Sequence, residues 1–217
     1  MIIAVDGPAA AGKGTLARRI AQHYRLDHLD TGRLYRATAL EALLAGGDPA
    51  DPTIAEAAAQ RVRPEHLGDP ELNEERVARA SSVVAAIPGV RAALLAFQRD
   101  FAHRPAGGRG AVLDGRDIGT VVMPDADAKI FVTASPETRA ARRFKELRAA
   151  GAEAIYERVL QDMQDRDARD SQRRNAPLRA ADDAVVLDTT DLDVEAAFAA
   201  ARDYVAAKLA FGKLGAR

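Results

Sequence analysis

Cysteine and tryptophan are absent from the 217 residues, and aromatic side chains make up only 5% of them. Without cysteine the chain forms no disulfide and no thiolate zinc site, which fits a reducing compartment. No apolar run approaches the ~18 residues of a membrane span, so we expect no membrane association. The first residues lack the basic segment and cleavage site of a signal peptide, and a cytoplasmic location is the resulting expectation.

An excess of charge of one sign is missing as well. The net charge is −1, with 31 basic and 32 acidic side chains, which gives no reason to expect nucleic acid as a partner. The G-x-S-x-G nucleophile element is also missing. The four histidines are scattered without metal-ligand spacing and are interpreted as structural or exposed: His23, His28, His66 and His103.

The most informative segment that is present reads Gly-Pro-Ala-Ala-Ala-Gly-Lys-Gly-Thr, at 7–15, directly after an apolar run. It matches G-x-x-x-x-G-K-[ST] with one glycine inserted before Thr15. Gly7 and Gly12 let successive N–H groups point at phosphate oxygens, and the helix expected from about Lys13 adds its positive end. Lys13 would supply charge for the β- and γ-phosphates, and Thr15 a hydroxyl for Mg²⁺. The alternative is a Gly/Ala-rich turn between a strand and a helix.

Five short apolar segments are typical of strands buried on both faces, because several are continuous rather than alternating. They are residues 2–6, 26–30, 111–114, 129–133 and 184–187. Helices are predicted behind Pro88, after Ser135-Pro136 as far as Arg148, and over the stripe Val194, Phe198, Val205 and Leu209. This alternation predicts an α/β fold with a doubly wound parallel sheet and a ligand crevice at the carboxyl ends of its strands.

Two stretches interrupt this plan. Residues 46–76 are polar, weakly periodic and rich in Gly, Pro, Asp and Glu. Residues 149–152, Ala-Ala-Gly-Ala, separate two charged helical patterns. We expect both to be mobile inserts in one domain rather than separate domains.

The segment Leu-Asp-Thr-Gly-Arg-Leu-Tyr-Arg follows the second predicted strand and faces the same crevice. Thr31 can cap the next helix, and Arg36 lies about one turn inside it. Both residues are candidates for binding a phosphate. The alternative is that Thr31 is only an N-cap and Arg36 a solvated helical arginine.

The segment Leu-Asp-Gly-Arg-Asp-Ile-Gly-Thr follows the third predicted strand. Asp114 can hold Mg²⁺ through water, as the second acidic element of phosphate-loop enzymes does. Gly115 and Gly119 allow close approach of the backbone to a ligand, and the Arg116 guanidinium suits phosphate. The alternative is a Gly-rich turn with an Arg–Asp pair on the surface.

The helix expected over about 153–174 carries charge on its buried face. Its apolar stripe consists of Ile155, Val159 and Met163, and helical spacing continues this stripe with Arg166, Asp170 and Arg173. A buried charge is costly unless it is paired or meets a ligand, so these side chains are predicted to line an anion-binding cleft. The alternative is a helix end that projects into water. Further arginines that could close over a triphosphate are Arg139, Arg142, Arg143 and Arg148.

On these segments the chain resembles the bacterial cytidylate kinases, of the nucleoside monophosphate kinase family. The resemblance covers nearly the whole chain and rests on GPAAAGKGTL, LDTGRLYR, AAIPGVRAALLAFQR, DGRDIGTVVMPDA, RDARDSQRRNAPL and AADDAVVLDTT. It implies a P-loop NTPase-type five-stranded sheet in a single domain, 1–217. This domain would carry a short, mobile monophosphate-binding insert at about 33–90 and a small lid at about 143–158.

The activity implied is transfer of the γ-phosphate of ATP to CMP or dCMP, with Mg²⁺, in pyrimidine nucleotide metabolism, by a monomer. ATP would be bound by Gly7, Pro8, Ala9, Ala10, Ala11, Gly12, Lys13, Gly14 and Thr15. CMP would be bound by Thr31, Arg36, Gly115, Arg116, Asp117, Arg166, Asp170 and Arg173. By the same resemblance Asp117 contacts cytosine, the catalytic residues are Lys13, Arg116 and Arg173, and the metal is held by Thr15 and, through water, Asp114.

One departure affects base recognition. Many family members carry a longer insert followed by an Arg-Thr or Arg-Ser pair, whereas here the matching stretch is Glu71–Glu75, with Asn73 in place of the arginine. Discrimination of cytosine from uracil is then either weakened or taken over by another residue, and Asp117 remains to accept the 4-amino hydrogen of cytosine.

Two other functions stay open on the sequence alone. A small-metabolite kinase of the same fold would phosphorylate an alcohol such as shikimate or a sugar acid, and would want a carboxylate base rather than many arginines. A nucleotide-dependent switch would normally show Asn-Lys-x-Asp, which this chain lacks.

Overall fold

The computed structural model describes residues 1–214, with side chains over 1–210. It contains one five-stranded sheet in the order β2-β3-β1-β4-β5. The strands are β1 (Ile2–Asp6), β2 (Asp27–Asp30), β3 (Ala111–Gly115), β4 (Ala128–Thr133) and β5 (Val185–Asp188). Each lies within one residue of its predicted bounds. Continuous apolar runs are a strong signal for buried strands such as β1, β3 and β4.

The central strand, β1, pairs in parallel with β3 on one side and β4 on the other, and β4 pairs in parallel with β5. In this register Asp6 lies opposite Gly115 of β3 and Phe131 of β4. The carboxyl ends of β1 and β3 therefore meet at one edge of the sheet, as the predicted α/β fold requires.

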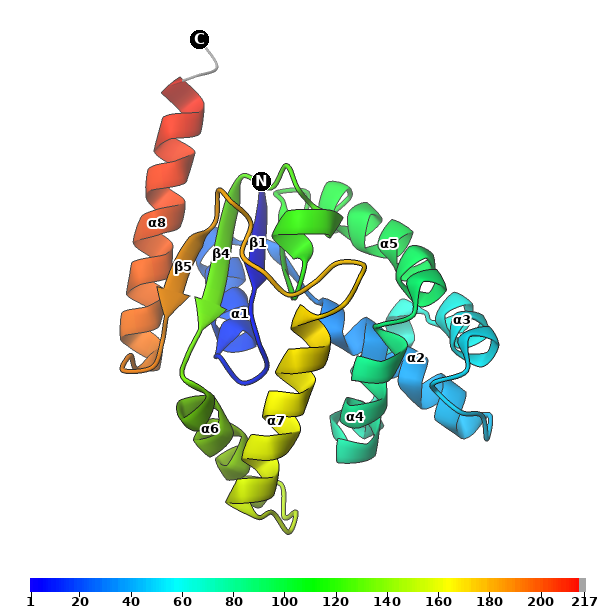
Figure 1. Ribbon diagram of the computed structural model, residues 1–217. Coiled ribbons are helices and arrows are strands. Elements are labelled where there is room, and N and C mark those ends of the chain that lie inside the picture. Colours follow the sequence, from blue (N-terminus) through cyan, green and yellow to red (C-terminus); the bar gives the residue numbers. More distant parts are fainter. Residues whose placement is uncertain (215–217) are drawn as a thin grey trace. The chain divides into compact units, whose positions relative to one another are not determined.

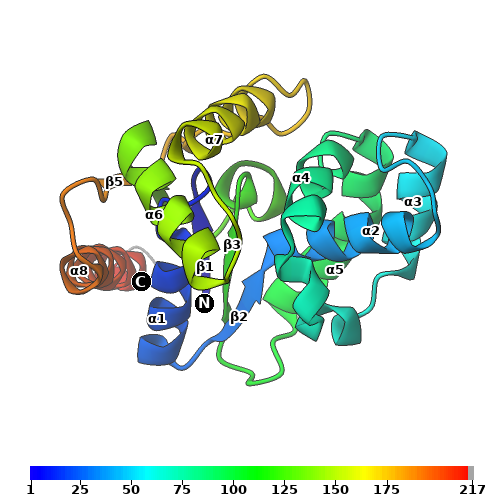
Figure 2. The same ribbon diagram turned by 90° about the horizontal axis from the view of Figure 1, so that it is seen from below.

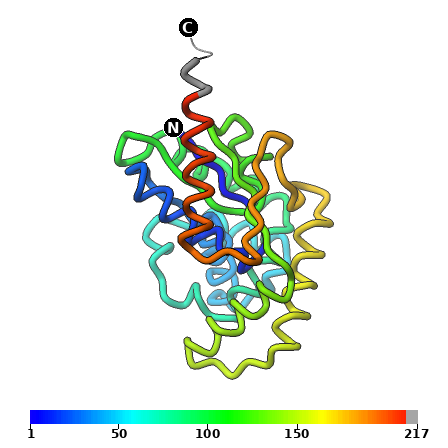
Figure 3. Tube along the Cα trace, turned by 90° about the vertical axis from the view of Figure 1, so that its left-hand side faces the viewer, coloured from blue at the N-terminus to red at the C-terminus, as the bar shows by residue number. Residues whose placement is uncertain are grey.

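Two compact units make up the chain, residues 1–28 with 102–217, and residues 29–101. In the first unit α1 (Lys13–Tyr24) and α8 (Val194–Leu214) pack against the sheet (Figures 1 and 3). Their apolar side chains share a buried cluster with β1, β3 and β4, whose members include Ile3, Val5, Ile20, Val112, Ile130, Ala201 and Val205. Val194 was expected in the stripe of α8, but it is exposed at the start of the helix.

Helices α6 (Pro136–Ala149) and α7 (Tyr156–Ser171) lie beyond the carboxyl ends of the strands (Figure 1). Ser135 caps α6 as predicted, because its hydroxyl accepts the N–H of Thr138 at 3.2 Å. Val159 and Met163 of α7 are buried against Ala140 of α6. The prediction for Ile155 was wrong: it precedes α7 and is exposed, so the apolar stripe begins one turn later.

The second unit is helical (Figure 2). Its helices are α2 (Thr31–Leu44), α3 (Pro52–Arg61), α4 (Glu75–Val84) and α5 (Pro88–His103), with short 3₁₀ turns at η1 (Pro64–Gly68) and η2 (Pro70–Asn73). The polar stretch 46–76 thus contains a helix, α3, which Asp51 caps by accepting the N–H of Thr53 at 2.8 Å. The unit encompasses the whole insert expected at about 33–90, and the mobility of that insert stays a prediction.

Across residues 1–214 no single helix is long and apolar enough to cross a membrane. Helices α4 and α5 meet that length and composition only as a pair bent by 100°.

Candidate active site

The loop between β1 and α1 has the backbone of a phosphate-binding loop. Gly7 has φ +149°, and a Cβ there would lie 2.0 Å from the carbonyl oxygen of Val132, so only glycine fits. Gly12 has φ +90° and precedes the first residue of α1, Lys13. The Lys13 ammonium lies 3.5 Å from the Pro8 carbonyl oxygen, folded back over the loop. The backbone turn and the start of a helix are therefore both present where the motif predicted them.

Side chains from outside the loop hold it in place. The hydroxyl of Thr189, just after β5, donates to the carbonyl of Ala11 at 3.0 Å. Arg139 of α6 donates to the carbonyl of Ala9 at 3.4 Å and pairs with Asp167 of α7 at 2.7 Å. The loop is thus tied to both helices at the carboxyl ends of the strands.

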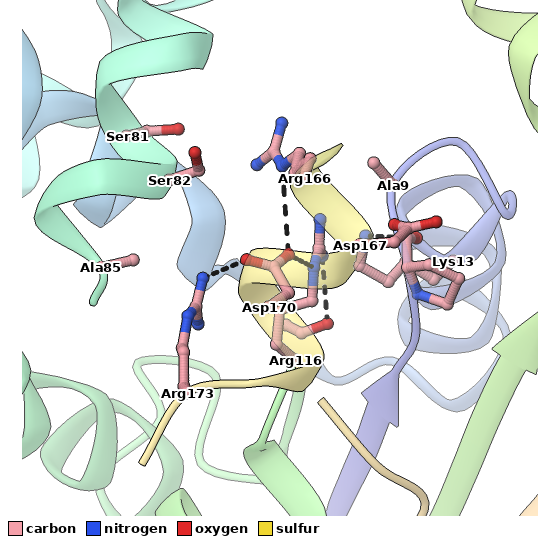
Figure 4. Close-up of polar contacts among 12 residues, drawn as sticks. Ala9, Lys13, Ser81, Ser82, Ala85, Arg116, Arg166, Asp167, Asp170 and Arg173 are labelled. Atoms are coloured by element: carbon pink, nitrogen blue, oxygen red, sulfur yellow. Dashed lines mark hydrogen bonds and ion pairs between the residues drawn. The ribbon is translucent and has the colours of Figure 1, made fainter. Parts of the chain in front are cut away.

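A cluster of arginines surrounds Asp170 near the end of α7 (Figure 4). Arg116 Nε lies 3.0 Å from Asp170 Oδ2, Arg166 Nε lies 4.0 Å from the same oxygen, and Arg173 pairs with Oδ1. The Asp170 side chain is only 1% exposed. Arg173 follows the end of the helix, yet its side chain turns back to the cluster and is 6% exposed.

This cluster decides between the alternatives left open by the sequence. The end of α7 does not project into water, because Asp170 and Arg173 are buried. Arg116 does not form a surface pair with its neighbour, because its partner lies 54 positions along the chain. The charges continue the buried face of the helix, as predicted from their spacing.

The pKa of Asp170 reflects this surrounding. Burial alone would raise the pKa, but the guanidinium groups of Arg116, Arg173 and Arg166 outweigh burial and hold it below the ordinary value. Asp170 is therefore ionised at neutral pH. Three guanidinium groups thus gather around one carboxylate, and guanidinium groups are also the side chains best suited to bind an anionic ligand.

The end of β3 brings Asp114 and Gly115 to the same edge of the sheet, and the loop after it adds Arg116 and Asp117. Gly115 and Asp117 are buried. The carbonyl of Asp117 accepts the N–H groups of Val121 and Val122, which begins the short helical turn η3 (Ile118–Val122). The buried carboxylate of Asp6 in turn holds the start of η3. Burial raises the pKa of Asp6 to about 7, although two backbone N–H donors and the Arg116 charge oppose it.

Asp114 lies between the phosphate loop and a histidine. Its Oδ1 is 2.8 Å from His28 Nε2, and its Oδ2 is 3.6 Å from the point where a Cβ on Gly14 would stand. His28 was interpreted as structural or exposed, but it contacts a predicted metal-binding residue. The contact forms because β2 and β3 are neighbours in the sheet, an order that local sequence patterns do not specify.

Two predicted site residues, Thr31 and Arg36, belong to the second unit. Thr31 is not an N-cap: Asp30 holds that position, and Thr31 is the buried first residue of α2. Arg36 is not a solvated arginine, because it is half-buried and donates to the carbonyl of Leu72 at 2.9 Å. Neither alternative interpretation holds for these residues.

The arginines of α6 differ in their contacts. Arg142 donates to the hydroxyl of Thr189 at 3.0 Å and to its carbonyl at 2.7 Å, so it braces the segment after β5. Arg143 contacts the exposed Glu146 at 3.4 Å. Arg139 lies deepest, against the phosphate loop. Its partner Asp167 keeps a second, buried carboxylate oxygen without a hydrogen bond. Sequence reasoning missed Asp167, which differs little from the other acidic residues of α7.

A parallel α/β sheet with a glycine-rich loop between its central strand and the next helix defines the class of phosphate-loop nucleotide-binding proteins. The family model for cytidylate kinase matches residues 3–206. The chain is 59% identical over 207 residues to the cytidylate kinase of Paramagnetospirillum magneticum, covering 95% of this chain and 98% of that protein. It is 61% identical over 201 residues to that of Methylocella silvestris, covering 93% and 92%. The chain belongs to the cytidylate kinase family.

A solved structure, of an uncharacterized protein from Eubacterium ventriosum, is similar to the model with a TM-score of 0.53 and 14% identity. It covers 94% of this chain and 98% of that one. At this identity the similarity concerns the fold alone.

Proposed function

We propose that this protein transfers the γ-phosphate of ATP to CMP or dCMP, giving ADP and CDP or dCDP. Family membership over residues 3–206 supports the activity. The observation that carries it within the site is the arginine cluster around Asp170, beside the phosphate loop. A second set of positive charges suits an acceptor that is itself a phosphate, whereas an alcohol acceptor would want a carboxylate base.

The reaction is direct in-line transfer between the two nucleotides. The acceptor phosphate is already an anion, so it needs no general base and no covalent enzyme intermediate. Catalysis then comes from positioning and from neutralising the negative charge that spreads over the transferred group. We assign the donor phosphates to the loop of residues 7–15 with Lys13, and the acceptor phosphate to Arg116, Arg166 and Arg173, with Thr31 and Arg36 also on the acceptor.

The residues around Asp114 fit a magnesium ion. The carboxylate and the Thr15 hydroxyl offer the oxygen ligands that this ion prefers, and Asp114 faces the phosphate loop at Gly14. Thr15 would hold the ion directly and Asp114 through water. A bound magnesium ion would neutralise charge on the β- and γ-phosphates.

The contact from His28 gives a testable consequence for this metal site. Because His28 engages Oδ1 of Asp114, it leaves Oδ2 facing the phosphate loop. Magnesium should raise the affinity of the protein for ATP. We expect the ratio of ATP affinity with Mg²⁺ to that without Mg²⁺ to be about tenfold smaller in His28→Ala than in the wild type. Isothermal titration of ATP with and without Mg²⁺ measures this gain apart from turnover. The exposed His103→Ala is the control, and an unchanged gain in His28→Ala would contradict the role.

Base recognition can be tested at Asp117, which we assign to the 4-amino group of cytosine. In Asp117→Asn the side-chain amide can also donate to the 4-oxo group of uracil. We expect the ratio of kcat/KM for CMP to that for UMP to fall by about 10–100-fold. The exposed Asp125→Asn, in the same segment, should leave the ratio unchanged. An unchanged ratio in Asp117→Asn would place base reading elsewhere.

The whole proposal is tested by an ADP-release assay with ATP and Mg²⁺, in which CMP, dCMP, UMP, AMP, GMP and shikimate are offered separately. Preference for CMP and dCMP is expected. Similar rates with CMP and UMP would show that the loss of an arginine at Asn73 has relaxed base reading. No turnover with any nucleotide would refute the kinase assignment.

A further inference from the structure

Asp6 connects two parts of the site that are far apart in the sequence. It is the last residue of β1, directly before the phosphate loop. Its Oδ1 accepts the N–H of Ile118 at 2.7 Å, and its Oδ2 accepts the N–H of Gly119 at 2.7 Å. These donors follow directly on Arg116 and Asp117. The Asp6 carboxylate thus lies next to the start of the phosphate loop and is hydrogen-bonded to the residues that follow Arg116 and Asp117.

We propose that Asp6 is a positioning residue, which fixes the acceptor loop, residues 115–117, relative to the phosphate loop. This inference rests on the proposed function, in which Arg116 and Asp117 bind the acceptor nucleotide. Asp6 itself contacts neither nucleotide in this proposal; it acts through the backbone of η3.

The sheet alone does not fix the acceptor loop. The pairing of β1 with β3 ends at Asp6 and Gly115, after which the chain leaves the sheet. Beyond that point two hydrogen bonds to the Asp6 carboxylate tie the start of η3 to β1. The direction in which Arg116 and Asp117 leave the sheet therefore depends on this carboxylate.

The two N–H groups need an acceptor of this kind. They stand at the start of a helical turn, where no carbonyl of the same turn is available. Asp6 is 5% exposed, so water does not replace it easily. A carboxylate is also costly at such depth, as its raised pKa shows. An apolar residue would avoid that cost but would leave both donors buried without a partner.

The contact between Asp6 and Gly119 is closely packed, so little space is left for a side chain at position 119. A Cβ on Gly119 would lie 3.4 Å from Asp6 Oδ2 and 3.1 Å from Cδ of the buried Lys129. Lys129 is itself held by Asp183 at 2.9 Å. A larger residue at 119 would therefore crowd the Lys129 side chain and disturb the contact of η3 with Asp6. Because a displacement of about 1 Å can cost about 10²-fold in rate, small shifts of this loop should be visible in kinetics.

The test is Asp6→Asn in the full-length protein. Asparagine keeps one oxygen acceptor but turns an NH₂ group toward the second N–H donor. We expect the KM for CMP to rise at least about tenfold, while the KM for ATP stays within twofold. Gly119→Ala, which disturbs the same contact from the other side, should give the same selective rise and carries the test if Asp6→Asn does not fold.

Val5→Ala is the structural control, because Val5 lies on the same strand and belongs to the buried apolar cluster. It should lower thermal stability without a selective change in either KM. If Asp6→Asn raises both KM values equally, or neither, Asp6 has a merely structural role and the proposal is overturned. Asp117→Asn distinguishes the positioning role of Asp6 from the assignment of Asp117 to the acceptor nucleotide. If Asp117→Asn raises the KM for CMP and Asp6→Asn does not, only the positioning role fails. If Asp117→Asn also leaves that KM unchanged, the acceptor assignment itself is wrong.

Discussion

Arg173→Ala should lower kcat by about 10³ or more, while ATP binding changes less than twofold. Arginines that meet the transferred phosphate contribute about 10³–10⁵ in rate in related phosphate-loop enzymes. We propose this role for Arg173, whose side chain is 6% exposed and is held against Asp170 in the arginine cluster. Loss of Arg173 leaves Asp170 paired with Arg116 and near Arg166, so the carboxylate stays compensated and the fold should survive.

Steady-state kinetics gives kcat, and calorimetry with a non-hydrolysable ATP analogue gives donor affinity. Arg174→Ala is the matched control, since Arg174 is the next residue and is exposed. Arg173→Lys should recover part of the loss, because it restores the charge but not the planar fork. Normal turnover in Arg173→Ala would remove this residue from the catalytic set.

The sequence was most informative where one element carries both a structural and a chemical signal. The three central strands, β3, β1 and β4, could be located because residues buried on both faces form largely apolar runs. The arginine cluster could be anticipated because Arg166 and Asp170 continue the buried face of a helix on which Val159 and Met163 are apolar. A charge at such a position must find a partner, so its presence indicated a cluster before any contact was known.

Contacts between elements could not be predicted from the sequence, because they depend on how distant segments are arranged rather than on local patterns. His28 meets Asp114 only because β2 and β3 are neighbours, and local patterns do not specify strand order. Asp6 meets the start of η3 across 112 positions in the chain. The helix α3 was missed because Gly, Pro and Asp around it dominated the composition, although Asp51-Pro52 is a good helix start. Ile155 fitted the helical period but falls before the helix begins.

Asp170→Asn should have the largest effect on stability. The substitution keeps the size of the side chain but removes the negative charge that three buried or half-buried guanidinium groups share. Removal of one partner from a buried ion pair costs about 3–5 kcal/mol, because the remaining charge loses its compensation. We expect the free energy of unfolding at pH 7 to fall by about 3 kcal/mol, measured by urea denaturation. The exposed Asp165→Asn, on the same helix, should change it by less than about 0.5 kcal/mol.

The pKa of Asp170 also predicts how the stability difference between wild type and Asp170→Asn changes with pH. The folded pKa of Asp170 lies below its ordinary value, so its contribution is fully present above that ordinary value, at about pH 4 and higher. It is lost as the pH falls through the folded pKa, and the difference between wild type and Asp170→Asn should shrink below pH 4. Asp6 acts in the opposite direction, because its raised pKa of about 7 lowers stability as the pH rises from about 4 to 7. Both proteins contain Asp6, so its effect cancels in the difference. A difference that stays constant down to pH 3 would show that the negative charge of Asp170 does not carry the stabilisation.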